Sequence, residues 1–355
     1  MRFRRGLIPA IVAPIAVVVA AIAVPSIAYS ASPPPDKTPA QVLTLIAGSH
    51  DAHYFGTVQQ TSDLGLPPLP TSMAPDSSSQ GLDAVSLVAL VTGSHSAQVY
   101  VDGQSKQRVQ ILDTLSERDL IHNDTSVWTY DAKARTATHL TASPHEPNAQ
   151  TDQALTPAAM ADGFIASITP TTSLTVSTDT FHGRGVYELT FEPRTSATLV
   201  GNAVVTVDAE TGVPLGVHVT PRGQTASAFS MAFTSIDFSR PDSSVFSFTP
   251  PTGTTVHDLT PPADGSNSMH PGNGDVTAPT VTGSGWESVV EVAAGTGTSA
   301  TTDQTPRDLS LLNELTQSVS GGRMLRTSLF TVYLRDDGTV FAGAVPASTL
   351  LATAK

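Results

Sequence analysis

Residues 97–131 read AQVYVDGQSKQRVQILDTLSERDLIHNDTSVWTYD and carry the strongest fold signal in the chain. Runs rich in β-branched, aliphatic and aromatic residues fall at 97–102, 108–113, 119–122 and 127–131. Gly, Asn or Asp residues lie between most of these runs and favour tight turns. Because the runs are short and their connections tight, the stretch predicts an antiparallel meander.

Strand signals continue on both sides of this meander. Further strands are expected at 54–60, 87–92, 136–140, 174–178, 185–192, 202–208, 215–220 and 227–237. Residues 208–212 (DAETG) predict a hairpin connection in which Gly212 takes a positive φ. Few helices interrupt the strands, so the sequence predicts an α+β fold, with one large antiparallel sheet and helices packed on one side of it.

Three Thr-Pro pairs mark the expected helix starts, at 38–39, 156–157 and 305–306. In each pair the Thr would cap the helix and the Pro would occupy its first turn. The first helix is expected to end near Gly48. The third is expected to stop at Gly321-Gly322 and to present one apolar face, made of Leu309, Leu312, Leu315 and Val319.

The chain divides into four expected parts. Residues 1–30 are interpreted as a signal peptide, 31–260 as the main domain and 261–280, rich in Pro, Gly, Ser and Asn, as a linker. Residues 281–355 are expected to form a small α+β unit. That unit would contain the third helix, a hairpin of 324–334 with 339–345, and a short helix at 347–354.

The N-terminus predicts export. Three arginines lie within the first five residues, and residues 6–24 are apolar and uncharged. Residues 28–30 (AYS) place small side chains where a signal peptidase cleaves. The alternative is a retained membrane anchor, since an apolar stretch of this length approaches what a bilayer requires. Either way, the rest of the chain is expected to be extracytoplasmic, in the cell envelope or beyond it.

Composition excludes several classes of function. The chain has no cysteine, which removes disulfides, zinc–thiolate sites and thiol nucleophiles. Its formal net charge of −13 repels nucleic-acid backbones, so no nucleic-acid partner is expected. No metalloprotease, nucleotide-binding or nucleophile-elbow motif occurs, and the chain is therefore predicted to be no enzyme, with no metal and no cofactor.

The segment 64–81 combines four prolines with four large apolar residues, Leu64, Leu66, Leu69 and Met73. It is too broken for a helix or strand and too apolar for a solvated linker. Such a loop is expected to cover the face of the sheet. From the residues alone, it could close an apolar cavity or cap a solid core.

Several segments together resemble the LolA superfamily, across about residues 38–259. They are HYFGTVQQ at 53–60, QVYVDG at 98–103, QRVQIL at 107–112, VWTYD at 127–131 and SVFSFTPPTG at 244–253. This superfamily includes periplasmic lipoprotein carriers and the amino-terminal domain of the MucB/RseB sigma-factor regulators. Within it, the chain looks most like the exported actinobacterial members.

The resemblance implies an eleven-stranded, strongly curved antiparallel sheet that forms an open half-barrel, with helices and a loop as its lid. Its concave face would be apolar and would receive acyl chains. The arginine that locks the lid of the carriers has no counterpart that can be placed in this sequence. The additional unit at 281–355 is similar in arrangement to MucB/RseB.

Strand alternation gives the residues expected to line the concave face, although a shift of one residue would turn any of them outward. They are Phe55, Val99, Val101, Val109, Ile111, Trp128, Leu189, Phe191, Phe229, Met231 and Phe233, with Leu66, Leu69 and Met73 in the covering loop.

The functional expectation is a non-enzymatic carrier or chaperone that binds a lipid or an acylated protein on this face. The alternative is an envelope-sensing regulator that binds a membrane-anchored anti-sigma factor or another membrane protein through residues 281–355. A third hypothesis, an exported hydrolase, would need a nucleophile–base pair that the sequence pattern does not display.

Overall fold

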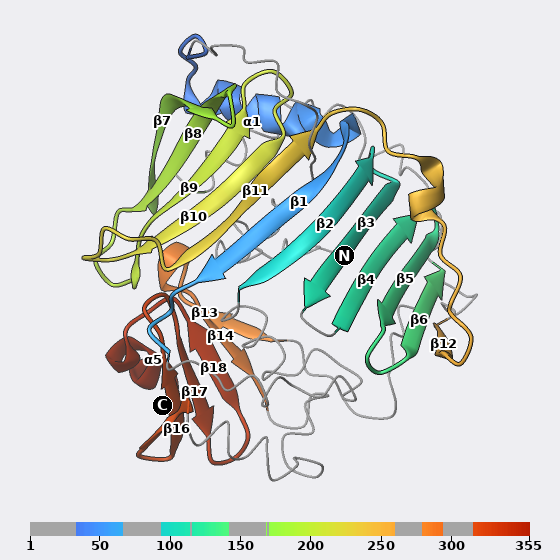
Figure 1. Ribbon diagram of the computed structural model, residues 1–355. Coiled ribbons are helices and arrows are strands. Elements are labelled where there is room, and N and C mark those ends of the chain that lie inside the picture. Colours follow the sequence, from blue (N-terminus) through green and yellow to red (C-terminus); the bar gives the residue numbers. More distant parts are fainter. Residues whose placement is uncertain are drawn as a thin grey trace, which may run out of the picture.

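The computed structural model describes residues 33–66, 94–113, 116–141, 168, 170–259, 279–293 and 315–355, which form two β-sheets (Figure 1). The first sheet has twelve strands in the order β12-β6-β5-β4-β3-β2-β1-β11-β10-β9-β8-β7. Because β12 and β7 are its two edges, the sheet is open. Its strands are β1 (His53–Ser62), β2 (His95–Asp102), β3 (Lys106–Asp113), β4 (Ser116–Asn123), β5 (Ser126–Asp131), β6 (Thr136–Thr141), β7 (Thr172–Phe181), β8 (Arg184–Pro193), β9 (Val200–Asp208), β10 (Pro214–Pro221), β11 (Phe229–Asp237) and β12 (Thr255–Leu259).

The expected meander is confirmed for β2 to β6, which follow one another both in sequence and in space. A single parallel pair departs from the antiparallel expectation, since β12 runs parallel to β6 with Thr255 beside Thr136. The chain reaches this edge after the short helix η3 (Ser243–Phe246), which crosses over β3 and β4. Sequence patterns did not predict β12. Prolines at 250 and 251 precede it, and proline is rare inside strands.

Helix α1 (Pro39–Gly48) starts and ends as expected. Thr38 caps it: the Thr38 hydroxyl accepts from the Gln41 N–H, and the Gln41 Oε1 accepts from the Thr38 N–H at 2.8 Å. This reciprocal pair is a capping box. Val42 is fully buried against the strands below, in a cluster with Leu189 and Val217. We call the surface that α1 covers the α1 face of the sheet.

The second sheet has the order β13-β14-β18-β17-β16-β15. Its strands are β13 (Thr280–Thr282), β14 (Val289–Val292), β15 (Gln317–Val319), β16 (Gly322–Arg326), β17 (Thr331–Arg335) and β18 (Val340–Gly343). The 3-10 helix η4 (Gly285–Glu287) precedes β14, and helix α5 (Ala347–Thr353) follows β18 as expected. Leu350 of α5 is buried with Met324, Tyr333 and Phe341 of the sheet.

Two expectations for this region are wrong. Val319 lies in β15 rather than on a helix, because Gly321, at φ +79°, turns the chain so that Val319 pairs with Gly322. The single strand at 324–334 is two strands, β16 and β17. Thr327 makes the turn between them: its hydroxyl accepts from the N–H groups of Leu329 and Phe330. The expected hairpin around 335–338 is present, with Gly338 at φ +87°.

Other expectations lie outside the described residues. They concern the signal peptide at 1–30, the strand at 87–92, the helix start at 156–157, the side chains of Leu69, Met73, Leu309 and Leu312, and most of the linker at 261–280. Within the part of the chain that the structure describes, no helix is both long and apolar enough to cross a bilayer.

Candidate binding face

Strand register sorts the eleven predicted lining residues onto two faces. Directly paired residues point to the same side of a sheet. Ala97 pairs with both Val58 and Ile111, and Val58 pairs with Phe233, so one row crosses four strands. A second row joins Leu189 to Met231 through Val205 and Val217, which pack under α1. The α1 face therefore holds Val99, Val101, Val109, Ile111, Leu189, Phe191, Phe229, Met231 and Phe233.

Phe55 and Trp128 lie on the opposite face, so the single-face expectation is wrong for these two residues. One row of paired residues connects them, and its members are Phe55, Tyr100, Arg108, Ile121 and Trp128. Phe55 stacks on Tyr100 with ring centroids 6.0 Å apart. Trp128 packs against Phe248, just after η3. On this opposite face, η3 and the residues that follow it cover part of the sheet. Aromatic side chains of β1 and β5 therefore point away from α1.

Burial divides the nine residues of the α1 face. Val99, Val101, Leu189 and Phe233 are at most 4% exposed and belong to the protein core. The other five are partly exposed, and we call them the half-buried set: Val109, Ile111, Phe191, Phe229 and Met231. Leu120 extends this set, since it pairs with Val109 on the same face and is 48% exposed. Of these ten residues, the half-buried set and Leu120 keep partly exposed side chains.

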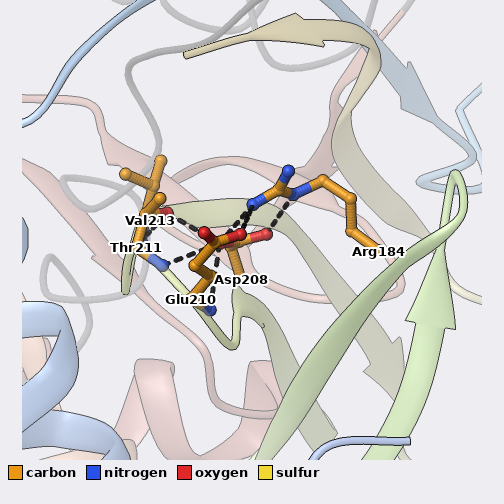
Figure 2. Close-up of polar contacts among 5 residues, drawn as sticks. All are labelled: Arg184, Asp208, Glu210, Thr211 and Val213. Carbon is orange, nitrogen blue, oxygen red and sulfur yellow. Dashed lines mark hydrogen bonds and ion pairs between the residues drawn. The ribbon is translucent and has the colours of Figure 1, made fainter. Parts of the chain in front are cut away.

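A buried ion pair fixes the hairpin that supports α1 (Figure 2). Asp208, with no exposed surface, binds the Arg184 guanidinium through two hydrogen bonds, one of them 3.1 Å long, and this contact raises the pKa of Arg184. Asp208 Oδ1 also accepts from the backbone N–H of Glu210 and from both the N–H and the hydroxyl of Thr211. Next in the turn is Gly212, at φ +76°, where an added Cβ would lie 2.2 Å from the carbonyl oxygen of Leu45 in α1. The turn and the helix are therefore in direct contact.

The second sheet packs against the α1 face at the end of the strands away from α1. Trp286, Leu329 and Ala344 share an apolar cluster with Val200 and Ala203 of β9. Leu64 of the predicted loop belongs to the same cluster, and Leu66, Phe191 and Phe229 pack against it. Sequence patterns did not predict this seam, the contact between the two sheets, because Trp286 is remote in sequence from the strands that it contacts. Its only local signal was a tryptophan directly after two glycines, Gly283 and Gly285.

The structure also brings together Ser126, His139 and Asp258, which sequence patterns did not connect. The Ser126 Oγ lies 3.0 Å from His139 Nε2, and His139 Nδ1 lies 3.1 Å from Asp258 Oδ1. This order matches a nucleophile, a base and an orienting carboxylate. However, the Asp258 side chain is 68% exposed, and β5 pairs on both sides, which directs its N–H groups into the plane of the sheet. The described strands thus offer no donors above Ser126 for an oxyanion.

These three residues instead tie edge strand β12 to the sheet. His139 stacks on Trp128 with ring centroids 4.2 Å apart and pairs directly with Asp258 in register. Within the described residues, no three His, Asp or Glu side chains gather as a metal site. His50 contacts Asp51 and the Ala47 carbonyl.

No protein-family model matches the sequence, and no curated protein matches it. Among solved structures, a chain of the Pseudomonas aeruginosa MucA/MucB complex is similar at 13% identity and a TM-score of 0.45, covering 89% of this chain and 96% of that one. A crystal structure of MucB gives 14% identity, a TM-score of 0.42, and coverage of 88% and 94%. A LolA superfamily protein from Nitrosomonas europaea gives 10% identity, a TM-score of 0.25, and coverage of 60% and 99%. Similarities at this level assign no activity to the chain.

Proposed function

We propose that this chain is a non-enzymatic, extracytoplasmic protein that binds the acyl chain of a lipid or lipoprotein on the α1 face. The observation that carries the proposal is the half-buried set, which gathers five large apolar side chains from β3, β8 and β11 on one side of one sheet. Exposed apolar surface of this continuity is typical of a binding site.

The strands between these residues keep the surface apolar. From β3 to β11 the α1 face passes over Val99 of β2 and Val58 of β1, both buried. The row of Ile111, Ala97, Val58 and Phe233 is apolar from β3 to β11, and we propose that this row sets the direction of a bound alkyl chain. Each methylene that it buries contributes about 0.8 kcal/mol.

A cation marks one end of this path. Arg118 of β4 pairs with Ile111 on one side and with Asp131 of β5 on the other, all on the α1 face. Fatty acids and many phospholipids carry an anionic head group, which a guanidinium attracts. We propose that the head group lies at this polar edge, near Arg118 and Asp131, and that the tail runs along the sheet toward Phe229 and Phe191.

The test compares substitutions on the two faces of the sheet. Ile111→Asn places an amide in the path of the chain and should weaken binding of a fluorescent fatty acid about tenfold. Ile111 belongs to none of the buried core clusters, so folding should survive the change. The matched control is Phe55→Asn, also half-buried but on the opposite face, which should leave the affinity unchanged. Equal loss in both variants, or none in either, would contradict the proposal.

A second candidate function is an envelope-sensing regulator that binds a membrane-anchored protein through its second sheet. The observation that favours it is β13, an edge strand whose three residues are all exposed, including Val281 at 42%. Such an edge can accept an added strand from a partner. This candidate predicts that a photocrosslinker at Val281 captures a membrane protein in the producing cell and that a neighbouring Thr280→Pro change abolishes the capture. Failure to capture any membrane protein counts against it.

A further inference from the structure

The two half-buried phenylalanines at the far end of the proposed path, Phe191 and Phe229, abut the second sheet. Both pack against the cluster that contains Trp286 and Leu329. Phe191 and Phe229 also contact the cluster under α1. The tail end of the path is thus bounded by α1 along one border and by Trp286 with Leu329 along the other.

Trp286 is held rigidly at this border. It is 7% exposed, and its indole Nε1–H donates to the Thr172 hydroxyl at 2.8 Å, in a buried hydrogen bond. The preceding residue, Gly285, has φ +56°, and a Cβ there would lie 2.8 Å from the Thr171 hydroxyl. The backbone at Gly285 therefore lies in close contact with Thr171, the residue before β7.

Further hydrogen bonds fasten the second sheet to the first. The Leu199 N–H donates to the Ala344 carbonyl at 2.8 Å, and the Thr198 hydroxyl donates to the same carbonyl at 2.6 Å. The Ser328 N–H donates to the Leu64 carbonyl at 3.0 Å. These contacts hold the second sheet, and with it Trp286 of η4, against the first sheet.

We propose that Trp286 is the end stop of the acyl path and sets the longest chain that the α1 face accepts. This inference rests on the proposed function and adds a specificity-determining residue to it. A chain whose head lies near Arg118 extends its tail toward Phe229 and Phe191 and meets the indole there. Methylenes beyond that contact remain in water and add no affinity.

The consequence is a break in the dependence of affinity on chain length. Below the limit, each additional methylene should raise the affinity about fourfold. Above the limit the affinity should stay level or fall. A path without a wall would instead give a continued rise across the series.

The experiment measures the affinity of residues 31–355 for saturated fatty acids, from octanoate to arachidate. Trp286→Ala removes the indole and should move the break to longer chains. Trp128→Ala is the matched control, because Trp128 is the only other tryptophan and lies on the opposite face. It should leave the break where the wild-type protein has it. Circular dichroism checks that each variant is folded.

A second measurement covers the case in which Trp286→Ala fails to fold. Trp128→Phe leaves Trp286 as the single fluorophore of the chain. Chains at or above the limiting length should then shift its emission, while short chains that bind should not.

The outcomes separate the two proposals. Fatty-acid binding with the same break in Trp286→Ala, or with no emission change at any length, overturns the end stop and leaves acyl binding intact. No binding at any length, with folded protein, overturns both. A break that moves only in Trp286→Ala supports both.

Discussion

Gly212→Ala should destabilise the protein by about 2 to 5 kcal/mol, as measured by urea unfolding. Two separate costs contribute. At φ +76° an alanine costs about 1 to 2 kcal/mol relative to its preferred backbone conformations. The new Cβ would also fall 2.2 Å from the Leu45 carbonyl oxygen, and forcing α1 away from the turn costs about 1 to 3 kcal/mol more.

Gly223→Ala separates these two costs. Gly223 has the same φ of +76°, but an added Cβ would meet no atom within 4 Å. It should lose only the backbone cost, about 1 to 2 kcal/mol. If the two alanine variants were equally stable, the close contact between the 208–212 turn and α1 would not exist.

Asp208→Asn should cost about 1 to 3 kcal/mol, because it removes the buried charge that binds Arg184 while Glu210 still pairs with the guanidinium. Asp208 has no exposed surface and the Arg184 side chain is 30% exposed. The asparagine can still accept from the N–H of Thr211, so the loss reports chiefly on the ion pair. The free energy of unfolding from a denaturant series measures it.

The control for charge removal is Asp337→Asn. Asp337 pairs with Arg335 in the hairpin of the second sheet, where its side chain is 52% exposed. Solvent screens such a pair, so this variant should be close to wild type in stability. Comparable destabilisation by the two asparagine variants would show that the Asp208 pair carries no special role in supporting the hairpin beneath α1.

Local signals predicted the elements of the first sheet well. The Thr38-Pro39 pair gave the start of α1, since a capping side chain and a first-turn proline act within a few residues. The β2–β6 meander followed from turn residues such as Gly103, which takes φ +69°. Both kinds of signal depend only on neighbouring residues, and so the sequence displays them directly.

The assignment of faces was harder. Tyr54 and Phe55 are consecutive and both aromatic, so apolarity alone does not say which one points toward α1. The register with β2 and β11 resolves this, and that register depends on pairing between distant strands. Trp128 was misplaced for the same reason, because η3 and Phe248 cover its face from far along the chain.

The seam between the sheets could not be predicted in the same way. Trp286 is 114 residues from Thr172, to which it donates. No periodic pattern links such positions. In the second sheet, Thr327 makes a turn with its own hydroxyl, so neither glycine nor proline marked the reversal between β16 and β17.

Native mass spectrometry with organic extraction of residues 31–355, purified from an exporting host, tests the acyl-binding proposal most directly. A lipid adduct on the folded protein, reduced in Ile111→Asn and retained in Phe55→Asn, is the predicted result. A bare protein mass that stays unchanged after phospholipid or an acylated peptide is added would contradict the proposal.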